Sequence, residues 1–351
     1  MSLVFSGIRP SGRLHLGNYL GAIKSWLDLQ NKYKCIYGVV DLHAMTTPFS
    51  PQELRQNTKD LILDLLALGL DLKKSTLILQ SQMPEHLELA WILGTLCPTS
   101  WLSRIPTYKE KIRLHPEYIN LGILSYPVLM AADILIYKAN FVPVGEDQLP
   151  HIELTNELAR RFNKKFGKTF DEIKPIITQG ARIMSLSNPS KKMSKTSDEG
   201  IGLFDPENEI RAKIKKATTD SGREIIYDPK NKPAISNLLM IYSLLSENGD
   251  SHRSVTVTDI KEIKGDSCRT CKATVTNIKE IEKKYKGKGY AKFKTDLAEV
   301  VVEFLKPYQE KREKLAKNWT KIEKSLQKSK KSAQKIANRN LKEIKGKIGL
   351  N

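Results

Sequence analysis

The stretch that decides the fold is LVFSGIRPSGRLHLGN, which runs from Leu3 to Asn18. Its first four residues predict a short buried strand, and an apolar pattern of helical spacing follows from Leu16 to Lys32. The loop between them contains Gly7 and Gly12, which allow a close approach of the backbone to a ligand. In an open parallel sheet, this first strand–helix connection is a place where nucleotides bind. We therefore expect the stretch to form one edge of a nucleotide site.

Strand and helix patterns alternate from this stretch up to about residue 188. The apolar runs Cys35–Asp41 and Thr76–Gln80 predict two more buried strands, and Pro51–Leu68 and Glu85–Leu96 predict helices. Alternation of helices with continuous apolar strands is typical of a doubly wound parallel sheet. We therefore predict an α/β fold with a Rossmann-type doubly wound sheet domain over residues 1–188.

The sequence pattern changes near residue 189, where segments of helical periodicity rich in Lys and Glu replace the strand-like apolar runs. Asn237–Ser246 and Phe293–Leu305 predict apolar helices. The segment 311–347, with twelve Lys and two Arg against three Glu, predicts one or two amphipathic helices with a basic outer face. A helical domain over residues 189–311 is the prediction.

A local duplication lies within this predicted helical domain. TVTDIKEI at 256–263 recurs as TVTNIKEI at 274–281, and we assign an insertion to about 249–272. Cys268 and Cys271 form a CxxC pair between the copies, and His252 could supply only a third ligand. Because structural zinc takes four protein ligands, we expect no bound metal at this pair.

The net charge of +19 favours polyanionic partners such as nucleic acid, an anionic membrane surface or phosphates, although a lysine-rich surface can also reflect a composition bias. No apolar run approaches the ~20 residues that a membrane-spanning helix needs. The N-terminal residues carry no charged leader, so the expected location is the cytoplasm and no membrane partner is expected.

A second motif, Lys191-Lys192-Met193-Ser194-Lys195-Thr196, stands where the α/β pattern ends. Such a flexible cationic loop can close over a triphosphate and stabilise the charge that develops on leaving pyrophosphate. His15 and Asn18 of the first motif can both donate hydrogen bonds to phosphate. Each motif alone is common in proteins.

Together the two motifs, HLGN at 15–18 and KMSKT at 192–196, resemble the HIGH and KMSKS signatures of class I aminoacyl-tRNA synthetases. Four segments between them are similar to the tryptophanyl-tRNA synthetases of the bacterial and organellar type. They are LMAADIL at 129–135, VPVGEDQ at 142–148, HIELT at 151–155 and GARIMSL at 180–186. The resemblance covers nearly the whole chain apart from the duplicated segment.

This resemblance implies a tryptophan–tRNA ligase that forms tryptophanyl-adenylate from L-tryptophan and ATP and then charges tRNA(Trp). It implies that magnesium arrives with ATP, that the enzyme is a homodimer, that a C-terminal helix at about 312–351 completes the catalytic domain, and that residues 189–311 face the anticodon side of the tRNA. The reaction needs no general base, because the tryptophan carboxylate attacks the α-phosphorus directly and catalysis consists of positioning and charge stabilisation.

The resemblance assigns the indole N–H of tryptophan to Asp133. Tryptophan offers one hydrogen-bond donor and no acceptor in its side chain, and phenylalanine would leave a buried carboxylate unpaired. The other residues expected around tryptophan are Phe5, Gly7, Arg9, His43, Tyr126, Met130, Val142, Val144 and Gln148. For Phe5 and Met130, plain core packing is the alternative. Arg9 departs from the Gln that many bacterial members have at its position.

The resemblance also assigns the ATP site. The expected catalytic residues are His15, Asn18, Lys111, Lys192 and Lys195. The residues expected to bind ATP are Gly7, Arg9, Pro10, Ser11, Gly17, Asn18, Gly145, Asp147, Ile183, Lys192, Met193, Ser194 and Lys195. Three alternatives stay open: a tyrosine–tRNA ligase, a non-catalytic RNA-binding paralogue, and a small-molecule nucleotidylyl transferase.

Overall fold

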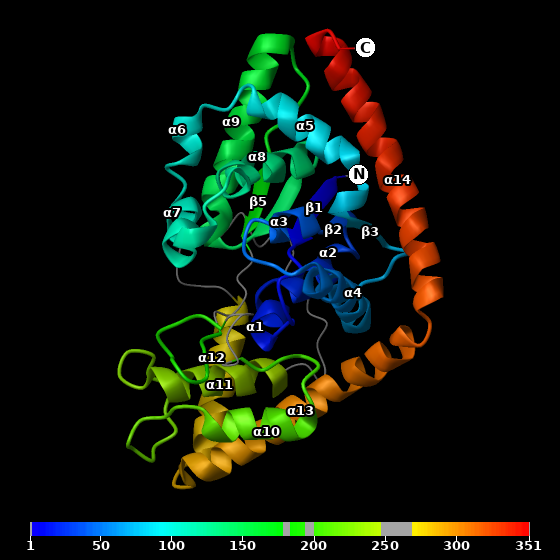
Figure 1. Cartoon of the computed structure of the whole chain (residues 1–351). Helices are drawn as coiled ribbons and strands as arrows, with labels where there is room; N and C mark the ends of the chain where they lie inside the picture. The colour runs from blue at the N-terminus through cyan, green and yellow to red at the C-terminus, as the bar shows by residue number, and fades with distance from the viewer. Residues whose placement is uncertain (1, 178–182, 194–199, 247–268, 351) are drawn as a thin grey trace. The chain divides into compact units, whose positions relative to one another are not determined.

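The computed structural model describes residues 2–177, 183–193, 200–246 and 269–350 (Figure 1). The chain divides into two compact units. The sheet unit consists of Met1–Ser11, Ser25–Gln179 and Lys314–Asn351, and the helical unit consists of Gly12–Lys24 and Gly180–Glu313. These compact units are made of discontinuous segments. The division into functional domains at 1–188 and 189–311 stays a prediction.

The sheet unit is built on five parallel strands in the order β3-β2-β1-β4-β5. The strands are β1 (Leu3–Ile8), β2 (Lys34–Val39), β3 (Ser75–Leu79), β4 (Phe141–Val144) and β5 (Lys174–Ile177). The chain proceeds outward from β1 to β3 and then returns to the other side of β1 with β4. This order places the topological switch point between β1 and β4, where open α/β sheets bind ligands. The predicted doubly wound fold is confirmed.

Helices surround this sheet, and several have clear local causes in the sequence. They are α2 (Lys24–Leu29), α3 (Asp41–Ala44), α4 (Pro51–Leu68), α5 (Pro84–Gly94), α6 (Thr99–Leu102), α7 (Pro106–Leu114), α8 (Leu121–Leu135), α9 (Leu149–Phe166) and α14 (Trp319–Ile348). The α4 bounds match the prediction, because the Ser50 hydroxyl accepts the Glu53 N–H at 3.1 Å and Gly69 ends the helix with φ 116°.

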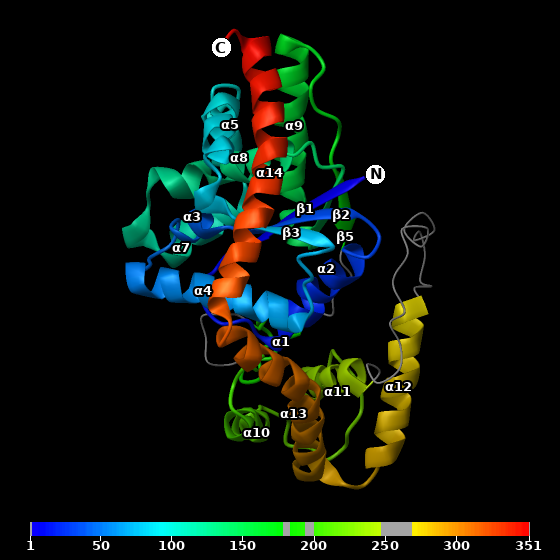
Figure 2. The same ribbon diagram turned by 90° about the vertical axis from the view of Figure 1, so that its right-hand side faces the viewer.

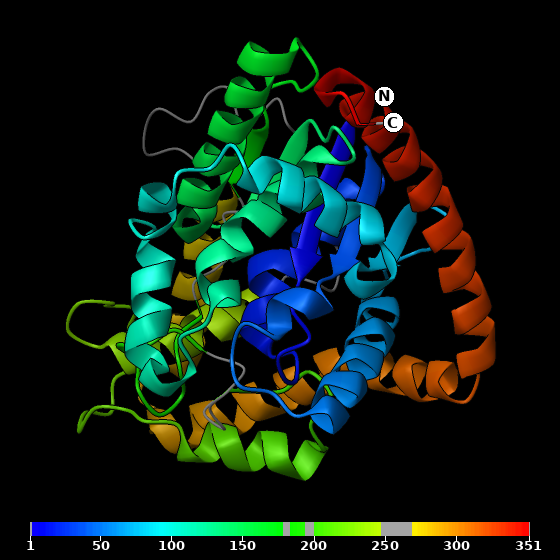
Figure 3. The same cartoon turned by 45° about the horizontal axis from the view of Figure 1, so that its top comes forward.

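The hydrophobic core of the sheet unit runs from the strands through α5, α8 and α9 to α14. Helix α14 contributes Ala333, Ala337, Leu341 and Ile344, and it lies beside β3 and α5 (Figure 2). Its buried Asn340 donates a hydrogen bond to the Ile136 carbonyl at 2.7 Å, so a polar residue is accommodated within the apolar face. Helices α8 and α9 pack side by side (Figure 3).

The helical unit contains α1 (Leu16–Asn18), a π-helical turn η1 (Tyr19–Ile23), α10 (Glu207–Lys216), α11 (Pro233–Ser246), α12 (Arg269–Tyr285) and most of α13 (Gly289–Ala316). The rings of Tyr242, Tyr285 and Phe293 meet at centroid distances of 5.0–5.9 Å and form the centre of its core. In the described part of the chain, no helix has both the length and the apolar character needed to cross a membrane.

Two sequence predictions need correction or restriction. The helix predicted from Leu16 to Lys32 is observed as α1, η1 and α2, because a π turn interrupts the α-helical hydrogen bonds at Tyr19–Ile23. Helix α2 then ends at Leu29. The first copy of the duplication and Cys268 lie outside the described residues, and the second copy lies in α12.

Candidate functional site

The carboxyl ends of the parallel strands present polar residues at one edge of the sheet. Arg9 follows β1, His43 lies in the short α3 after β2, and Gln80 begins the turn η2 (Gln80–Gln82) after β3. Asp147 lies in the turn η4 (Glu146–Gln148) after β4. Because the strands are parallel, their carboxyl ends share one edge, and residues distant in sequence are collected there.

Helix α8 supplies the centre of the site. Tyr126, Met130 and Asp133 are spaced by four and three residues, so they share one face of the helix. The helix begins at a capped position, since Asn120 Oδ1 accepts the Ile123 N–H at 3.0 Å. Asp133 is only 2% exposed, and its carboxylate therefore requires partners from the protein.

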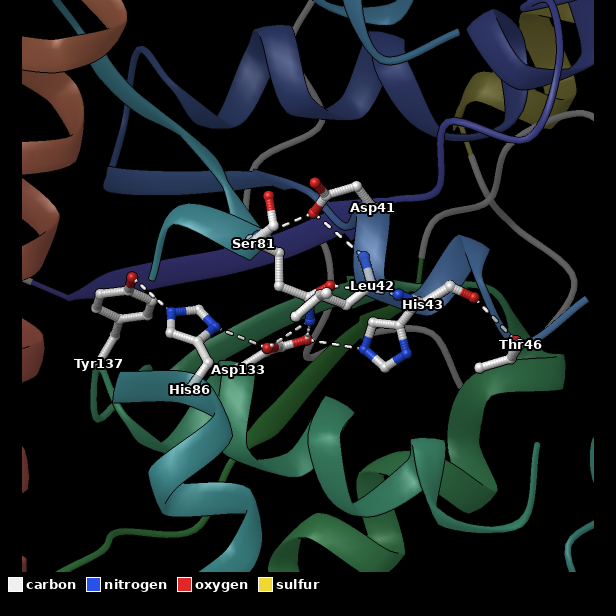
Figure 4. A network of polar contacts seen from close by, with 9 residues as sticks. Asp41, Leu42, His43, Thr46, Ser81, His86, Asp133 and Tyr137 are labelled. Carbon is white, nitrogen blue, oxygen red and sulfur yellow. Dashed lines mark hydrogen bonds and ion pairs between the residues drawn. The ribbon is translucent and has the colours of Figure 1, made fainter. Parts of the chain in front are cut away.

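Three side chains contact the Asp133 carboxylate (Figure 4). His43 Nε2 lies 2.9 Å from Oδ2, and His86 Nδ1 lies 2.7 Å from Oδ1. Gln80 Nε2 donates to both oxygens, at 2.9 and 2.8 Å. On the far side of its ring, His86 Nε2 lies 2.8 Å from the Tyr137 hydroxyl. These five residues, which we call the Asp133 network, join elements that follow β2 and β3 to α5 and α8.

The Asp133 network keeps the carboxylate ionised. Burial by itself raises the pKa of Asp133, but the hydrogen bonds from His43 and His86, together with their electrostatic attraction, lower it to about 2. An ionised carboxylate only accepts hydrogen bonds, so His43 Nε2 and His86 Nδ1 must each carry a proton. Burial and the negative charge of Asp133 raise the pKa of Tyr137, so its hydroxyl stays neutral.

A second cluster surrounds the Tyr126 ring. The Lys111 ammonium lies 3.8 Å from the ring centroid and donates to Thr46 Oγ1 at 3.2 Å. The Tyr126 hydroxyl lies 2.6 Å from Thr107 Oγ1 and 3.0 Å from His151 Nε2. Burial and the charge of Lys111 lower the pKa of His151 to about 4, so this imidazole is neutral at pH 7.

Arg9 lies close to this cluster. Its guanidinium is half-buried, and burial lowers its pKa while the attraction of Tyr126 raises it. Burial and then the repulsion of Arg9 lower the pKa of Lys111 to about 8. Two cations beside one aromatic ring form a place suited to a carboxylate or phosphate group of a substrate.

The apolar residues predicted around tryptophan belong to the core of the sheet unit. Phe5, Val142 and Val144 are buried core residues, and Met130 packs against them. The Phe5 ring stacks on Tyr137 at a centroid distance of 5.7 Å. The core therefore reaches the Asp133 network through this stacked pair.

Two predicted glycines have little room for a side chain. A Cβ atom at Gly7 would lie 2.9 Å from Val40 Cγ1, and one at Gly145 would lie 2.7 Å from Asp147 Oδ1. The backbone at both positions is thus closely approached by neighbouring side chains. Gln148 donates to Asp147 Oδ2 at 2.7 Å, so these two predicted site residues are hydrogen-bonded to each other on the surface.

The helical unit brings the two sequence motifs together. A Cβ atom at Gly17 would lie 3.1 Å from the His15 ring and 3.6 Å from Met193 Cβ. The Met193 N–H donates to the Ile183 carbonyl at 3.1 Å, and Asn18 Oδ1 accepts the His15 N–H at 3.1 Å. His15 and Gly17 therefore lie in one small region with Met193, which follows them by about 175 residues in the sequence.

The remaining predicted ATP residues divide into three groups. Pro10 is buried and Ser11 is half-buried directly after β1. Lys192 is exposed to solvent. Ser194 and Lys195 lie outside the described residues.

Sequence reasoning missed Gln80, His86, Tyr137, Thr107 and His151. One signal was available for Gln80, because it directly follows a predicted strand. His86 lies in α5 between Glu85 and Glu88 at the start of an apolar stretch, and a single histidine in a helix is common without any function. The identity of its partners depends on tertiary packing.

Two further observations delimit the site. Within the described residues, no group of three or more His, Cys, Asp or Glu side chains is arranged to hold a metal ion. A surface groove between α9 and β5, lined in part by Leu149, Glu153, Asn156 and Lys174, contains none of the predicted site residues.

Comparison with known proteins points in one direction. The family described as "tRNA synthetases class I (W and Y)" matches residues 2–306. A tryptophan–tRNA ligase of Wolinella succinogenes is 43% identical over 351 residues, covering 99% of this chain and 98% of that protein. The crystal structure of tryptophanyl-tRNA synthetase from Mycoplasma pneumoniae superposes with a TM-score of 0.83 at 35% identity, covering 100% of this chain and 98% of that one. The enzyme from Campylobacter jejuni, complexed with ADP and tryptophan, gives a TM-score of 0.80 at 32% identity, with full coverage of both chains.

Proposed function

The chain belongs to the class I tRNA synthetases of the tryptophan and tyrosine group, and from this premise we infer that it is a tryptophan–tRNA ligase. It activates L-tryptophan with ATP to tryptophanyl-adenylate and pyrophosphate. It then transfers the tryptophanyl group to the 3′-terminal ribose of tRNA(Trp), with release of AMP.

The observation that carries this function is the buried, ionised Asp133 carboxylate. Its pKa of about 2 makes it a hydrogen-bond acceptor at every physiological pH, which suits the single N–H donor of indole. A phenylalanine side chain offers no donor and would bring no compensation for disturbing the carboxylate. The tyrosine enzymes are the nearest alternative, and the relatives named above are tryptophan enzymes.

In the activation step, an oxygen of the tryptophan carboxylate forms a bond to the α-phosphorus of ATP while the bond to the pyrophosphate oxygen breaks. No proton has to be removed from the nucleophile, so catalysis consists of alignment and charge stabilisation. Lys111, Lys192 and Lys195 hold the phosphates of ATP and the departing pyrophosphate. Magnesium enters bound to ATP, as part of the substrate.

The nucleotide contacts follow from the two motifs. His15 and Asn18 bind phosphate, while the lack of a side chain at Gly17 leaves space for adenine beside Ile183 and Met193. Gly7, Pro10, Ser11 and Ser194 line the path of the phosphates, and Gly145 and Asp147 contact the ribose. The cluster of His15, Gly17 and Met193 supports this assignment.

The amino-acid contacts lie in the sheet unit. Arg9, Tyr126 and Gln148 bind the polar end of tryptophan, and the pair of cations beside Tyr126 supports this role for Arg9. The indole ring lies against the side of the Asp133 network, bounded by Gly7 and His43. Its apolar walls are Phe5, Met130, Val142 and Val144.

The tRNA binds the basic helices, with residues 189–311 on the anticodon side. The exposed lysines of α14 support a contact with the phosphate backbone. A homodimer is supported by large apolar side chains on the surface of the sheet unit, including Trp91 at 79% and Leu121 at 77% exposure. We place the enzyme in the cytoplasm.

The deciding experiment is ATP–pyrophosphate exchange with each of the twenty amino acids in the absence of tRNA. We expect exchange with tryptophan alone. Exchange with tyrosine would preserve the family and overturn the assignment of Asp133. A folded, ATP-binding protein that supports no exchange would instead be an RNA-binding paralogue.

A further inference from the structure

The Asp133 carboxylate is already surrounded by donors. Three side chains approach its two oxygens within 2.9 Å, and the residue is 2% exposed. An indole N–H forms a hydrogen bond only if its nitrogen comes within about 3.2 Å of a carboxylate oxygen. The expected contact with tryptophan therefore requires that one of the present donors moves.

Two of the donors, Gln80 and His86, each have a second hydrogen-bond partner besides Asp133. Gln80 and His86 are both 0% exposed. His86 is clamped between Asp133 and the Tyr137 hydroxyl, and Gln80 contacts both carboxylate oxygens while its own Oε1 accepts the His43 backbone N–H at 3.4 Å. Moving either residue would break two sets of contacts inside the core.

His43 differs from these two donors. It is 7% exposed, and it comes from the four-residue helix α3 at the end of β2. It approaches the carboxylate from the side opposite to His86 (Figure 4). Its other ring neighbour is Tyr126, whose ring it meets edge-on at a centroid distance of 6.1 Å. The side of the network that carries His43 is therefore the side that faces the amino-acid cluster around Tyr126.

We propose that His43 is the exchangeable donor of the Asp133 network: its Nε2–H occupies Asp133 Oδ2 in the free enzyme and gives way to the indole N–H of tryptophan, while Gln80 and His86 stay in place. This inference rests on the proposed function. The exchange keeps the buried carboxylate hydrogen-bonded before and after binding, so the free enzyme avoids the cost of an uncompensated buried charge. His43 is thereby a positioning residue: its competition for Asp133 Oδ2 sets how much the indole N–H hydrogen bond adds to the affinity for tryptophan.

The exchange is observable in the imidazole N–H signals of the full-length protein labelled with ¹⁵N-histidine, with His43→Phe used to assign the His43 signal. We expect a protected His43 Nε2–H signal in the free protein that is lost on saturation with L-tryptophan. The signal should persist on saturation with 3-benzothienyl-L-alanine, in which sulfur replaces the indole N–H. The His86 Nδ1–H signal should persist with both ligands. A His43 signal that remains protected with saturating tryptophan overturns the proposal.

A binding measurement provides the second arm. His43→Phe keeps an aromatic ring and removes the competing donor, so the ratio of the dissociation constants of 3-benzothienyl-L-alanine and tryptophan should rise roughly threefold or more by calorimetry. His115→Phe, at a half-buried histidine outside the network, is the matched control and should leave the ratio unchanged. An unchanged ratio in His43→Phe contradicts the exchange. If wild-type protein does not bind tryptophan at all, the proposed function fails together with this inference; binding with a persistent His43 signal rejects the inference alone.

Discussion

His43 Nε2 lies 2.9 Å from Asp133 Oδ2, although the two residues are 90 positions apart in the sequence. The pair joins the short helix after β2 to the middle of α8. Through Asp133 it is continuous with Gln80 and His86, so the β2–β3 and β3–β4 connections of the sheet meet at one carboxylate. Changes at this carboxylate should consequently act on the amino acid rather than on the nucleotide.

Substitution of Asp133 by Ala or Asn tests this separation. We expect the KM for tryptophan to rise roughly tenfold or more, because the ionised acceptor is lost and buried donors are left without a partner. The KM for ATP should change by less than about twofold. Pyrophosphate exchange measures both constants. Asp133→Asn keeps the shape of the side chain and a neutral acceptor oxygen, so it isolates the loss of charge, whereas an unchanged tryptophan KM in Asp133→Ala would exclude the indole contact.

Tyr137→Phe removes only the hydroxyl that backs His86. We expect a loss of about 1 kcal/mol in the free energy of unfolding and a rise of a few-fold in the KM for tryptophan, because His86 Nε2 loses its partner and holds Asp133 less firmly. The matched control is Tyr290→Phe, which removes a hydroxyl that donates to Asp220 at 2.6 Å in the helical unit. It should cost similar stability by urea unfolding without changing the tryptophan KM. Equal KM effects in the two variants would reduce His86 to a structural role.

The pH dependence of ATP use should report Lys111. A lysine is a cation below its pKa, and burial together with Arg9 lowers the pKa of Lys111 to about 8. We therefore expect kcat/KM for ATP, which reflects the free enzyme, to fall as the pH rises through about 8. Lys111→Arg should abolish this decline, because arginine stays charged. Arg9→Gln should move it to higher pH by removing the repulsion. A profile that is flat to pH 9.5 in the wild type would contradict this assignment.

Gly17→Ala probes the junction of the two motifs. The added Cβ would stand 3.1 Å from the His15 ring and must displace it, so the KM for ATP should rise several-fold. Gly21→Ala in the adjacent turn η1 is the control, since its Cβ would meet no atom within 4 Å. That variant should keep the wild-type KM and an equal or higher midpoint of thermal unfolding. Equal KM values in the two alanine variants would remove His15 and Gly17 from the nucleotide site.

Lys195→Ala should lower the rate of tryptophan activation roughly tenfold or more with little change in ATP binding, because the lost charge acts mainly on the departing pyrophosphate. Single-turnover adenylate formation separates the two quantities. Lys191→Ala, at an exposed lysine of the same segment, serves as the control. A purely raised ATP dissociation constant in Lys195→Ala would assign this lysine to ground-state binding.

The sequence by itself determined the class of fold and the order of its main elements. Continuous apolar strands alternating with helical patterns predicted the parallel sheet, and Ser50, Pro51 and Gly69 bounded α4 through local capping. These signals are local, since each depends on neighbours within one or two turns of the chain. The two motifs also identified His15, Gly17 and Met193, which the structure brings together.

Only the tertiary structure decided which residues partner Asp133. Nothing within a few residues of Gln80, His86 or Tyr137 indicates that they meet, because their contacts arise when α5 packs on α8 and on the turn η2 that follows β3. The same packing removes Asp133 from water, and the surrounding donors then lower its pKa although burial alone would raise it. The apolar residues around Asp133 in the sequence indicate that this aspartate is buried. Its charge state and its exchangeable partner, however, depend on distances between elements that are remote in the sequence.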